Sequence, residues 1–188
     1  DDLLEINDLE TSKTFFGGFA KVLNAMRTCR KIVVVRVQGK TTGGGVGIAC
    51  AADYCFATEN ASLALTEINL GIGPFVIGTY VERKIGKSQF TAMAIDADFR
   101  SANWAEQHNI YHSVSPTIAE MDSEIAQFLE KLASRSSDAL ALIKKVSWEG
   151  TEHFTELSPE RIHMSASLIL EDTAKKNIEK IKENLRAK

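Results

Sequence analysis

The sequence has few cysteines, no long apolar run and no excess of basic residues. Only three of its 188 residues are cysteines. Cys29, Cys50 and Cys55 lack C-x-x-C spacing, which argues against a disulfide framework and predicts reduced core thiols. No apolar run approaches the roughly 18 residues needed to cross a bilayer, so we predict no membrane partner. The net charge of −3 likewise predicts no nucleic-acid partner.

Signals for secretion and for metal binding are also missing. The chain starts with Asp1 and Asp2 and shows no basic segment before an apolar run, so we expect no signal peptide and a cytoplasmic protein. His108 and His112 are the best-spaced histidine pair, but a strand is expected to begin between them, so we predict no metal. The 44% hydrophobic and 25% charged residues are typical of one globular domain with a real core.

The most informative segment is a glycine-rich loop between a strand-like run and a helix. Residues 32–37 are β-branched apart from Arg36, which predicts a strand buried on both faces of a parallel or mixed sheet. The glycines of the loop and of the helix start are Gly39, Gly43, Gly44, Gly45 and Gly47. Residues 44–53 then predict a helix of small residues. This order exposes backbone N–H groups at a helix N-terminus, where they can hold negative charge.

Three functional interpretations of this loop compete with a structural one. A P-loop fails because Val34 stands where its first glycine belongs, and a dinucleotide fingerprint fails because Ile48 stands where a small residue is needed. An oxyanion hole, in which N–H donors polarise a carbonyl, needs only glycine-permitted backbone and the helix dipole. A tight turn with glycines for packing needs no ligand. The residues alone do not decide between the oxyanion hole and the tight turn.

Glu67 is the candidate proton-transfer group. It lies between Leu65 and Ile68, and such apolar neighbours disfavour the charged form and raise the pKa of a carboxyl toward the range used in acid–base catalysis. The structural alternative is a loop carboxylate in solvent. Asp53, which follows the predicted helix, is interpreted as an acceptor for backbone donors.

The rest of the chain divides into a mixed first part and a helical second part. Helices are expected over 10–29, 75–85 and 87–95, short strands over 54–57, 62–65 and 110–114, and a helix capped by Ser101. After Pro116 only helices are expected, over 117–134, 138–149, 158–170 and 172–186. This division predicts an α/β core over residues 1–115 and a helical C-terminal module over residues 116–188.

The order of these motifs resembles the crotonase, or enoyl-CoA hydratase/isomerase, superfamily. The segments that carry the resemblance are 38–39, 43–45, 51–53, 65–71, 85–87 and 105–114. The resemblance implies a spiral of ββα turns whose C-terminal helices mediate trimer contacts, and hence a homotrimer or a dimer of trimers. It implies an acyl-CoA thioester as substrate, with coenzyme A as part of that substrate and no separate cofactor.

The resemblance also implies roles for particular residues. The N–H of Gly44 matches one of two donors that hold the thioester oxygen, and Glu67 matches the acid/base that acts on the resulting enolate. We assign Gly43, Gly47 and Gly71 to substrate binding. Losing one oxyanion donor typically costs about 10²–10³ in rate.

Two departures limit what the resemblance implies. Hydratases of the family carry a second glutamate where this chain has Gly47, so water addition by two glutamates cannot be carried over. Residues 73–77 resemble the methylglutaconyl-CoA and carboxygeranoyl-CoA hydratase-like subgroup, in which Gly47 would leave room for a branched or carboxylated acyl chain. The segment that supplies the second donor is matched only by its tail, at residues 1–5, so we expect the N-terminal part of the spiral to be absent from this chain.

These observations predict an enzyme, a lyase of the enoyl-CoA hydratase/isomerase type. The leading hypothesis is hydration of an enoyl-CoA thioester with Glu67 as acid/base. A single-glutamate isomerase or decarboxylase is the alternative that needs only one carboxylate. A non-catalytic acyl-CoA-binding subunit is the alternative from another class.

Overall fold

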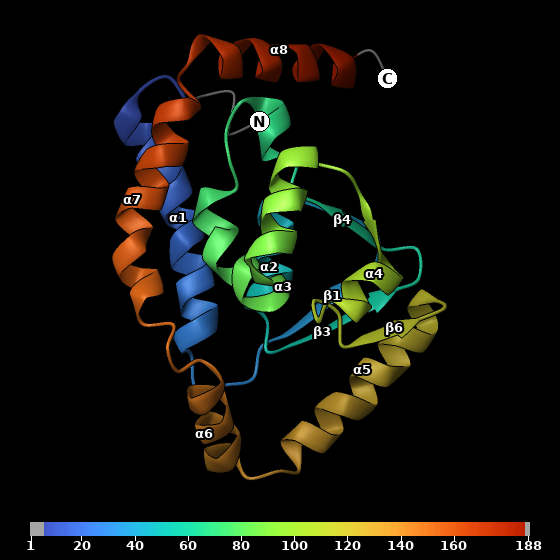
Figure 1. Cartoon of the computed structure of the whole chain (residues 1–188). Coiled ribbons are helices and arrows are strands. Elements are labelled where there is room, and N and C mark those ends of the chain that lie inside the picture. Colours follow the sequence, from blue (N-terminus) through green and yellow to red (C-terminus); the bar gives the residue numbers. More distant parts are fainter. Residues whose placement is uncertain (1–5, 187–188) are drawn as a thin grey trace.

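Two small three-stranded sheets form the centre of the computed structural model, which describes residues 6–186 (Figure 1). The first sheet has the order β1-β3-β6, all parallel, and consists of β1 (Val34–Val37), β3 (Tyr54–Thr58) and β6 (Ser113–Ser115). The second has the order β2-β4-β5 and consists of β2 (Lys40–Thr42), β4 (Ser62–Ala64) and β5 (Arg100–Ser101). Strand β4 pairs with β2 in parallel and with β5 antiparallel.

The first four strands of the chain alternate between the two sheets, whereas β5 follows β4 in the second sheet and β6 returns to the first. Strands β3 and β4 are separated only by a turn at Glu59 and Asn60, yet they belong to different sheets and do not form a hairpin. Helix α2 follows β1 and β2, and η2 and α3 follow β3 and β4, so each of these two ββ pairs is followed by a helical segment that carries the chain to the next turn of a spiral; in the last turn α4 lies between β5 and β6. The predicted α/β fold with a ββα spiral is therefore confirmed.

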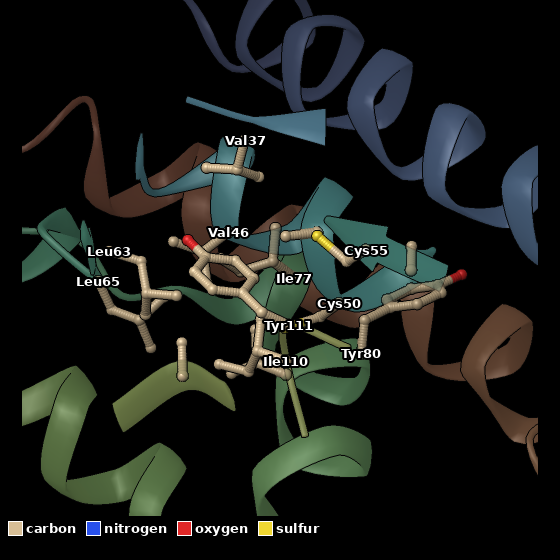
Figure 2. Close-up of a cluster of buried hydrophobic side chains, with 14 of the residues drawn as sticks. Val37, Val46, Cys50, Cys55, Leu63, Leu65, Ile77, Tyr80, Ile110 and Tyr111 are labelled. Carbon is tan, nitrogen blue, oxygen red and sulfur yellow. The ribbon is translucent and has the colours of Figure 1, made fainter. Parts of the chain in front are cut away.

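Small residues allow helix α2 (Gly44–Ala51) to lie inside the spiral. Five of its residues are buried, among them Val46 and Cys50. Figure 2 shows these side chains together with Ile77 and Tyr111, whose ring lies in the middle of the cluster. The core therefore surrounds α2 and fixes the position of both of its ends.

The helices of the first part follow the prediction closely. They are α1 (Leu9–Thr28), α3 (Phe75–Asp96), α4 (Ala102–Gln107) and the one-turn 3-10 helix η2 (Glu67–Leu70). Helix α3 is interrupted at Gly86, whose φ of +76° is non-helical, at the predicted division between two helices. Ser101 caps α4 as predicted, because its Oγ accepts a hydrogen bond from the Trp104 N–H at 3.2 Å.

The C-terminal helices are α5 (Ile118–Ala133), α6 (Ser137–Ser147), α7 (His153–Leu168) and α8 (Asp172–Arg186). Helix α7 runs beside α1, and α8 crosses the end of the molecule opposite to α5 and α6 (Figure 1). The expected start of α7 at residue 158 was wrong, because Pro159 lies inside the helix instead of in its first turn. Proline removes one helical hydrogen bond there. Packing against α1, which includes a bond from Ser12 Oγ to the Ala166 carbonyl, holds the helix together.

Three local predictions were wrong. Strand β1 lies at a sheet edge within the described residues, so only Val37 is buried, while Arg36 is exposed and pairs with Asp122. The glycine loop contains strand β2, which pairs with β4 and could not be read from local sequence. Cys29 is exposed, whereas Cys50 and Cys55 are buried free thiols as predicted.

None of the helices in residues 6–186 is long and apolar enough to span a membrane. The division into a core and a C-terminal module stays a prediction.

Candidate active site

Gly43 positions the start of helix α2. Its φ of +50° and ψ of −118° favour glycine. The Gly43 N–H donates to the Ala64 carbonyl at 3.2 Å, which ties the loop to β4. The N–H groups of Gly44 and Gly45 lie in the first turn of α2, where a helix offers them no acceptor. Together with the helix dipole, these donors make a site for developing negative charge.

The Glu67 carboxyl lies directly against Gly43. A Cβ atom added to Gly43 would lie 3.2 Å from Glu67 Oε1, so the missing side chain makes the space that the carboxyl occupies. Glu67 is the first residue of η2, which directly follows β4. The structure thus brings two predicted site residues into contact, although more than twenty positions separate them in the sequence.

Burial dominates the electrostatics of Glu67. Glu67 Oε2 is buried and makes no hydrogen bond to any of the described residues. Loss of hydration disfavours the carboxylate and raises the pKa of Glu67 to about 7. The predicted direction of this shift is confirmed. Near neutral pH the group is therefore able both to give and to take a proton.

Helices α1 and α3 close the other sides of α2. A Cβ atom added to Gly44 would lie 2.9 Å from Phe19 Cζ, and one added to Gly47 would lie 2.5 Å from Ile77 Cγ2. Ile77 therefore fills the space beside Gly47 that was expected to be open for an acyl chain, and the assignment of Gly43 and Gly47 to substrate binding stays a prediction. Sequence reasoning missed Phe19 and Ile77 as neighbours of the glycines, since both contacts join elements distant in the chain.

Gly71 has a structural role that explains its residue type. It ends η2 with a φ of +84°, and a Cβ atom added to it would lie 3.4 Å from the backbone of Ala174 in α8. Positive φ and the close approach of α8 both favour glycine at this position. Its assignment to substrate binding stays a prediction.

The opposite end of α2 holds a buried ion pair. Asp53 Oδ2 accepts from the Val33 N–H at 2.8 Å, as the sequence predicts, and lies 2.7 Å from Lys144 Nζ. Asp53 Oδ1 accepts from Trp148 Nε1 at 2.9 Å. Sequence reasoning missed Lys144, whose side chain is only 3% exposed. The available signal was its spacing from Trp148, since residues four apart share one face of a helix.

The described residues provide no group of three or more histidine, cysteine or acidic side chains that could hold a metal ion. Residues 1–5, where the tail of the second oxyanion-donor segment was predicted, lie outside the described part of the chain.

Comparison with known sequences gives consistent matches. The chain is 30% identical over 145 residues to the mitochondrial enoyl-CoA hydratase of Pongo abelii, covering 77% of this chain and 50% of that protein. It is 28% identical to the 2,3-dehydroadipyl-CoA hydratase of Escherichia coli, covering 80% of this chain and 59% of that protein. It is 23% identical to the trans-2-decenoyl-acyl-carrier-protein isomerase of Streptococcus mutans, covering 89% of this chain and 64% of that protein. The chain thus spans about half to two thirds of the length of these curated relatives.

Comparison with solved structures confirms the fold. The crystal structure of an enoyl-CoA hydratase from Mycobacterium avium superposes with a TM-score of 0.85 at 21% identity, over 94% of this chain and 69% of that chain. The sequence model described as enoyl-CoA hydratase/isomerase matches residues 1–187. The chain therefore belongs to the enoyl-CoA hydratase/isomerase family.

Proposed function

We propose that this protein hydrates an enoyl-CoA thioester, with Gly44 stabilising the thioester oxygen and Glu67 transferring the proton. The observation that carries the proposal is the contact between the Glu67 carboxyl and Gly43 at the start of α2. It puts a titratable group beside backbone donors suited to an enolate oxygen. The names of the two hydratases among the relatives support an enoyl-CoA substrate, and the name of the isomerase, which acts on an acyl-carrier-protein thioester, supports the wider class of enoyl thioesters.

The proposed reaction uses charge developing on the thioester carbonyl. As a nucleophile adds to the double bond, negative charge moves to the carbonyl oxygen, where the Gly44 N–H and the dipole of α2 stabilise it. The Glu67 carboxylate accepts the proton that the adding water loses, and the resulting carboxyl donates it to the carbon beside the carbonyl, so that H and OH add across the double bond and Glu67 returns to its starting state. Its pKa of about 7 leaves both protonation states populated at neutral pH.

Isomerisation of the double bond is the second candidate, favoured by the packing around Gly47. Moving a double bond requires one group that removes a proton from one carbon and returns it to another. Glu67 alone is sufficient for this. The position of the family's second glutamate is Gly47, and Ile77 Cγ2 lies 2.5 Å from where its Cβ would begin, so the fold provides no room there for a second carboxylate.

Activity of a Glu67→Gln variant tests the proposal. With a short enoyl-CoA, loss of the absorbance of the conjugated thioester measures hydration, and product analysis with 2-enoyl and 3-enoyl substrates measures isomerisation. We expect the variant to lose a factor of about 10²–10⁴ in kcat, the usual contribution of a general acid or base. The matched control is Glu59→Gln, in an exposed turn, which should retain full activity.

The two assays also separate the candidates. Turnover only in the isomerase assay would select the second candidate. Full turnover by Glu67→Gln would remove Glu67 from the mechanism, and binding of acyl-CoA without turnover by the wild type would indicate a non-catalytic binding protein.

We also propose that the protein self-associates as a trimer or a dimer of trimers. Three apolar side chains of α6 support an interface, because they are unusually exposed: Leu142 at 61%, Ile143 at 59% and Val146 at 62%. Sedimentation velocity measures the assembly, and a monomer at micromolar concentration would contradict this proposal.

A further inference from the structure

A cavity lies at the C-terminal end of α2, which is remote from Glu67. It has a volume of about 400 Å³ and is bounded by β3, α3, α5 and α6. The N-terminal end of α2, near Glu67, and its C-terminal end, at the cavity, lie about 12 Å apart, since each of the eight residues of the helix rises about 1.5 Å. In Figure 1, α5 and α6 lie at the opposite end of the molecule from α8. The cavity is therefore separate from the candidate active site.

The lining of this cavity carries more positive than negative charge. Its cationic side chains are Arg83, Lys84, Arg135 and Lys144. Asp53 is the carboxylate in the lining, and Lys144 pairs with it at 2.7 Å. Within residues 6–186, none of the other three cations forms an ion pair. Burial lowers the pKa of Lys84, and the nearby Arg83 acts in the same direction, while the Asp53 carboxylate offsets only part of this shift.

Two hydrogen-bond donors face each other at the wall of the cavity. The Cys55 N–H donates to His112 Nδ1 at 3.0 Å. A neutral imidazole that accepts at Nδ1 carries its proton on Nε2. Partial burial and the nearby Lys84 lower the pKa of His112 to about 4, so the ring is neutral at pH 7. His112 Nε2 lies 3.5 Å from Lys84 Nζ, and an ammonium has no acceptor.

This geometry leaves a place for an acceptor. Because an N–H and an ammonium cannot satisfy each other, an oxygen atom that contacts both nitrogens would complete the arrangement. Such an oxygen, if it carried negative charge, would also compensate the cations of the lining. Arginine and lysine side chains are the usual partners of phosphate oxygens.

Aromatic rings form an apolar wall beside these donors. The Tyr54 ring stacks on His112 with centroids 4.6 Å apart and lies 4.3 Å from the Phe128 ring. The cavity volume is in the range of sites that bind small organic molecules. We propose that this cavity binds a phosphate group through His112 Nε2–H and Lys84 Nζ, as free phosphate or as a phosphate ester whose organic part contacts the aromatic wall.

Calorimetric titration of the full chain with two probes tests this site, independently of any enzymatic activity. The probes are inorganic phosphate and phenyl phosphate, each at constant ionic strength. We expect saturable binding of at least one of them. Tighter binding of phenyl phosphate identifies an ester as the ligand, and equal affinities identify free phosphate. Nitrogen NMR of His112 should show Nε2 protonated and shifted by the ligand.

Lys84→Met should weaken phosphate binding by a factor of at least about ten, the usual contribution of a hydrogen bond to a charged group. Lys87→Met is the matched control on the same helix, because Lys87 is 85% exposed and does not line this cavity. It should bind phosphate as the wild type does. The proposal is overturned if neither probe binds, if Lys84→Met binds as tightly as the control, or if chloride competes equally well. Failure here would leave the proposed enoyl-CoA activity unaffected.

Discussion

The two ends of helix α2 differ in how their buried charge is compensated. At the C-terminal end, Asp53 accepts hydrogen bonds from Val33 and Trp148 and pairs with Lys144. At the N-terminal end, the Glu67 carboxyl is also largely buried, yet its Oε2 has no hydrogen-bond partner among residues 6–186. One short helix thus separates a satisfied carboxylate from an unsatisfied one.

The difference separates structural from reactive carboxyl groups. Partners that stabilise a carboxylate keep it ionised and remove it from proton transfer, whereas a desolvated carboxyl without partners has a pKa near neutrality. Asp53 is held by three partners as a structural anchor, and the unpartnered Oε2 of Glu67 supports the proposal that Glu67 is the acid/base. The unsatisfied Glu67 carboxyl lowers the free energy of unfolding. The hydrogen-bonded ion pair of Asp53 at the other end does not carry this cost.

The largest expected effect on stability comes from breaking the satisfied end. Lys144→Met removes the ammonium, which also donates to the carbonyls of Met26 and Lys31. It leaves the Asp53 carboxylate largely buried without its counter-charge. Breaking a buried pair in this way costs about 3–5 kcal/mol, measured by urea unfolding.

Lys145→Met is the control for this substitution, because Lys145 is adjacent and exposed. It should change the free energy of unfolding by less than about 0.5 kcal/mol. If the two variants were equally stable, the N–H donors alone would satisfy Asp53. The ion pair with Lys144 would then not be what makes the two ends of α2 differ in stability.

The next effect concerns the pH dependence of stability at the unsatisfied end. The pKa of Glu67 is about 7 in the folded protein and near 4.5 in the unfolded chain. Between these values the folded protein keeps a proton that the unfolded chain has released, so the free energy of unfolding falls as pH rises through this window. Glu67→Gln stays neutral and should remove this fall.

Urea unfolding from pH 4 to pH 8 measures this difference. At pH 8 the variant should gain up to about 3 kcal/mol relative to the wild type, compared with their difference at pH 4. Glu59→Gln, whose side chain is exposed, should follow the wild-type curve. Parallel curves for Glu67→Gln and the wild type would show that Glu67 is solvated and that the two ends of α2 are alike.

Local sequence was sufficient to predict the parts of the site that depend on neighbours in the chain. The glycine-to-helix junction at Gly43 follows from backbone freedom, and the raised pKa of Glu67 follows from its apolar surroundings. Ser101 as a helix cap and Gly86 as a break in α3 follow from equally local rules.

Contacts between distant elements could not be predicted in this way. Lys144 lies in the helix predicted over 138–149, and only the fold brings it to Asp53. Strand β2 is three residues long and exists through its pairing with β4. The space beside Gly47 looked open because nothing local indicated Ile77. Pairing and packing across the spiral supply this information, and a single sequence does not display it.

The smallest of these effects tests how closely Ile77 packs against Gly47 near the N-terminal end of α2. Gly47→Ala adds a methyl group at a helix-interior position, which by propensity alone would stabilise the protein by about 1 kcal/mol. The new Cβ would lie 2.5 Å from Ile77 Cγ2 and 2.9 Å from Ile77 Cβ, so helices α2 and α3 must shift. We expect a net loss of about 1–3 kcal/mol in the free energy of unfolding, the usual cost of overpacking.

Two backgrounds at position 77 separate the clash from other causes. Ile77→Ala removes Cγ2 and leaves only the 2.9 Å approach to the Cβ atom, so in that background the cost of Gly47→Ala should fall. Ile77→Val keeps Cγ2, so there the substitution should remain as costly as in the wild type. Equal costs in the two backgrounds would show that Ile77 does not fill the space beside Gly47. The site would then have room for a second carboxylate, and the packing argument that favours a single-glutamate isomerase would lose its basis.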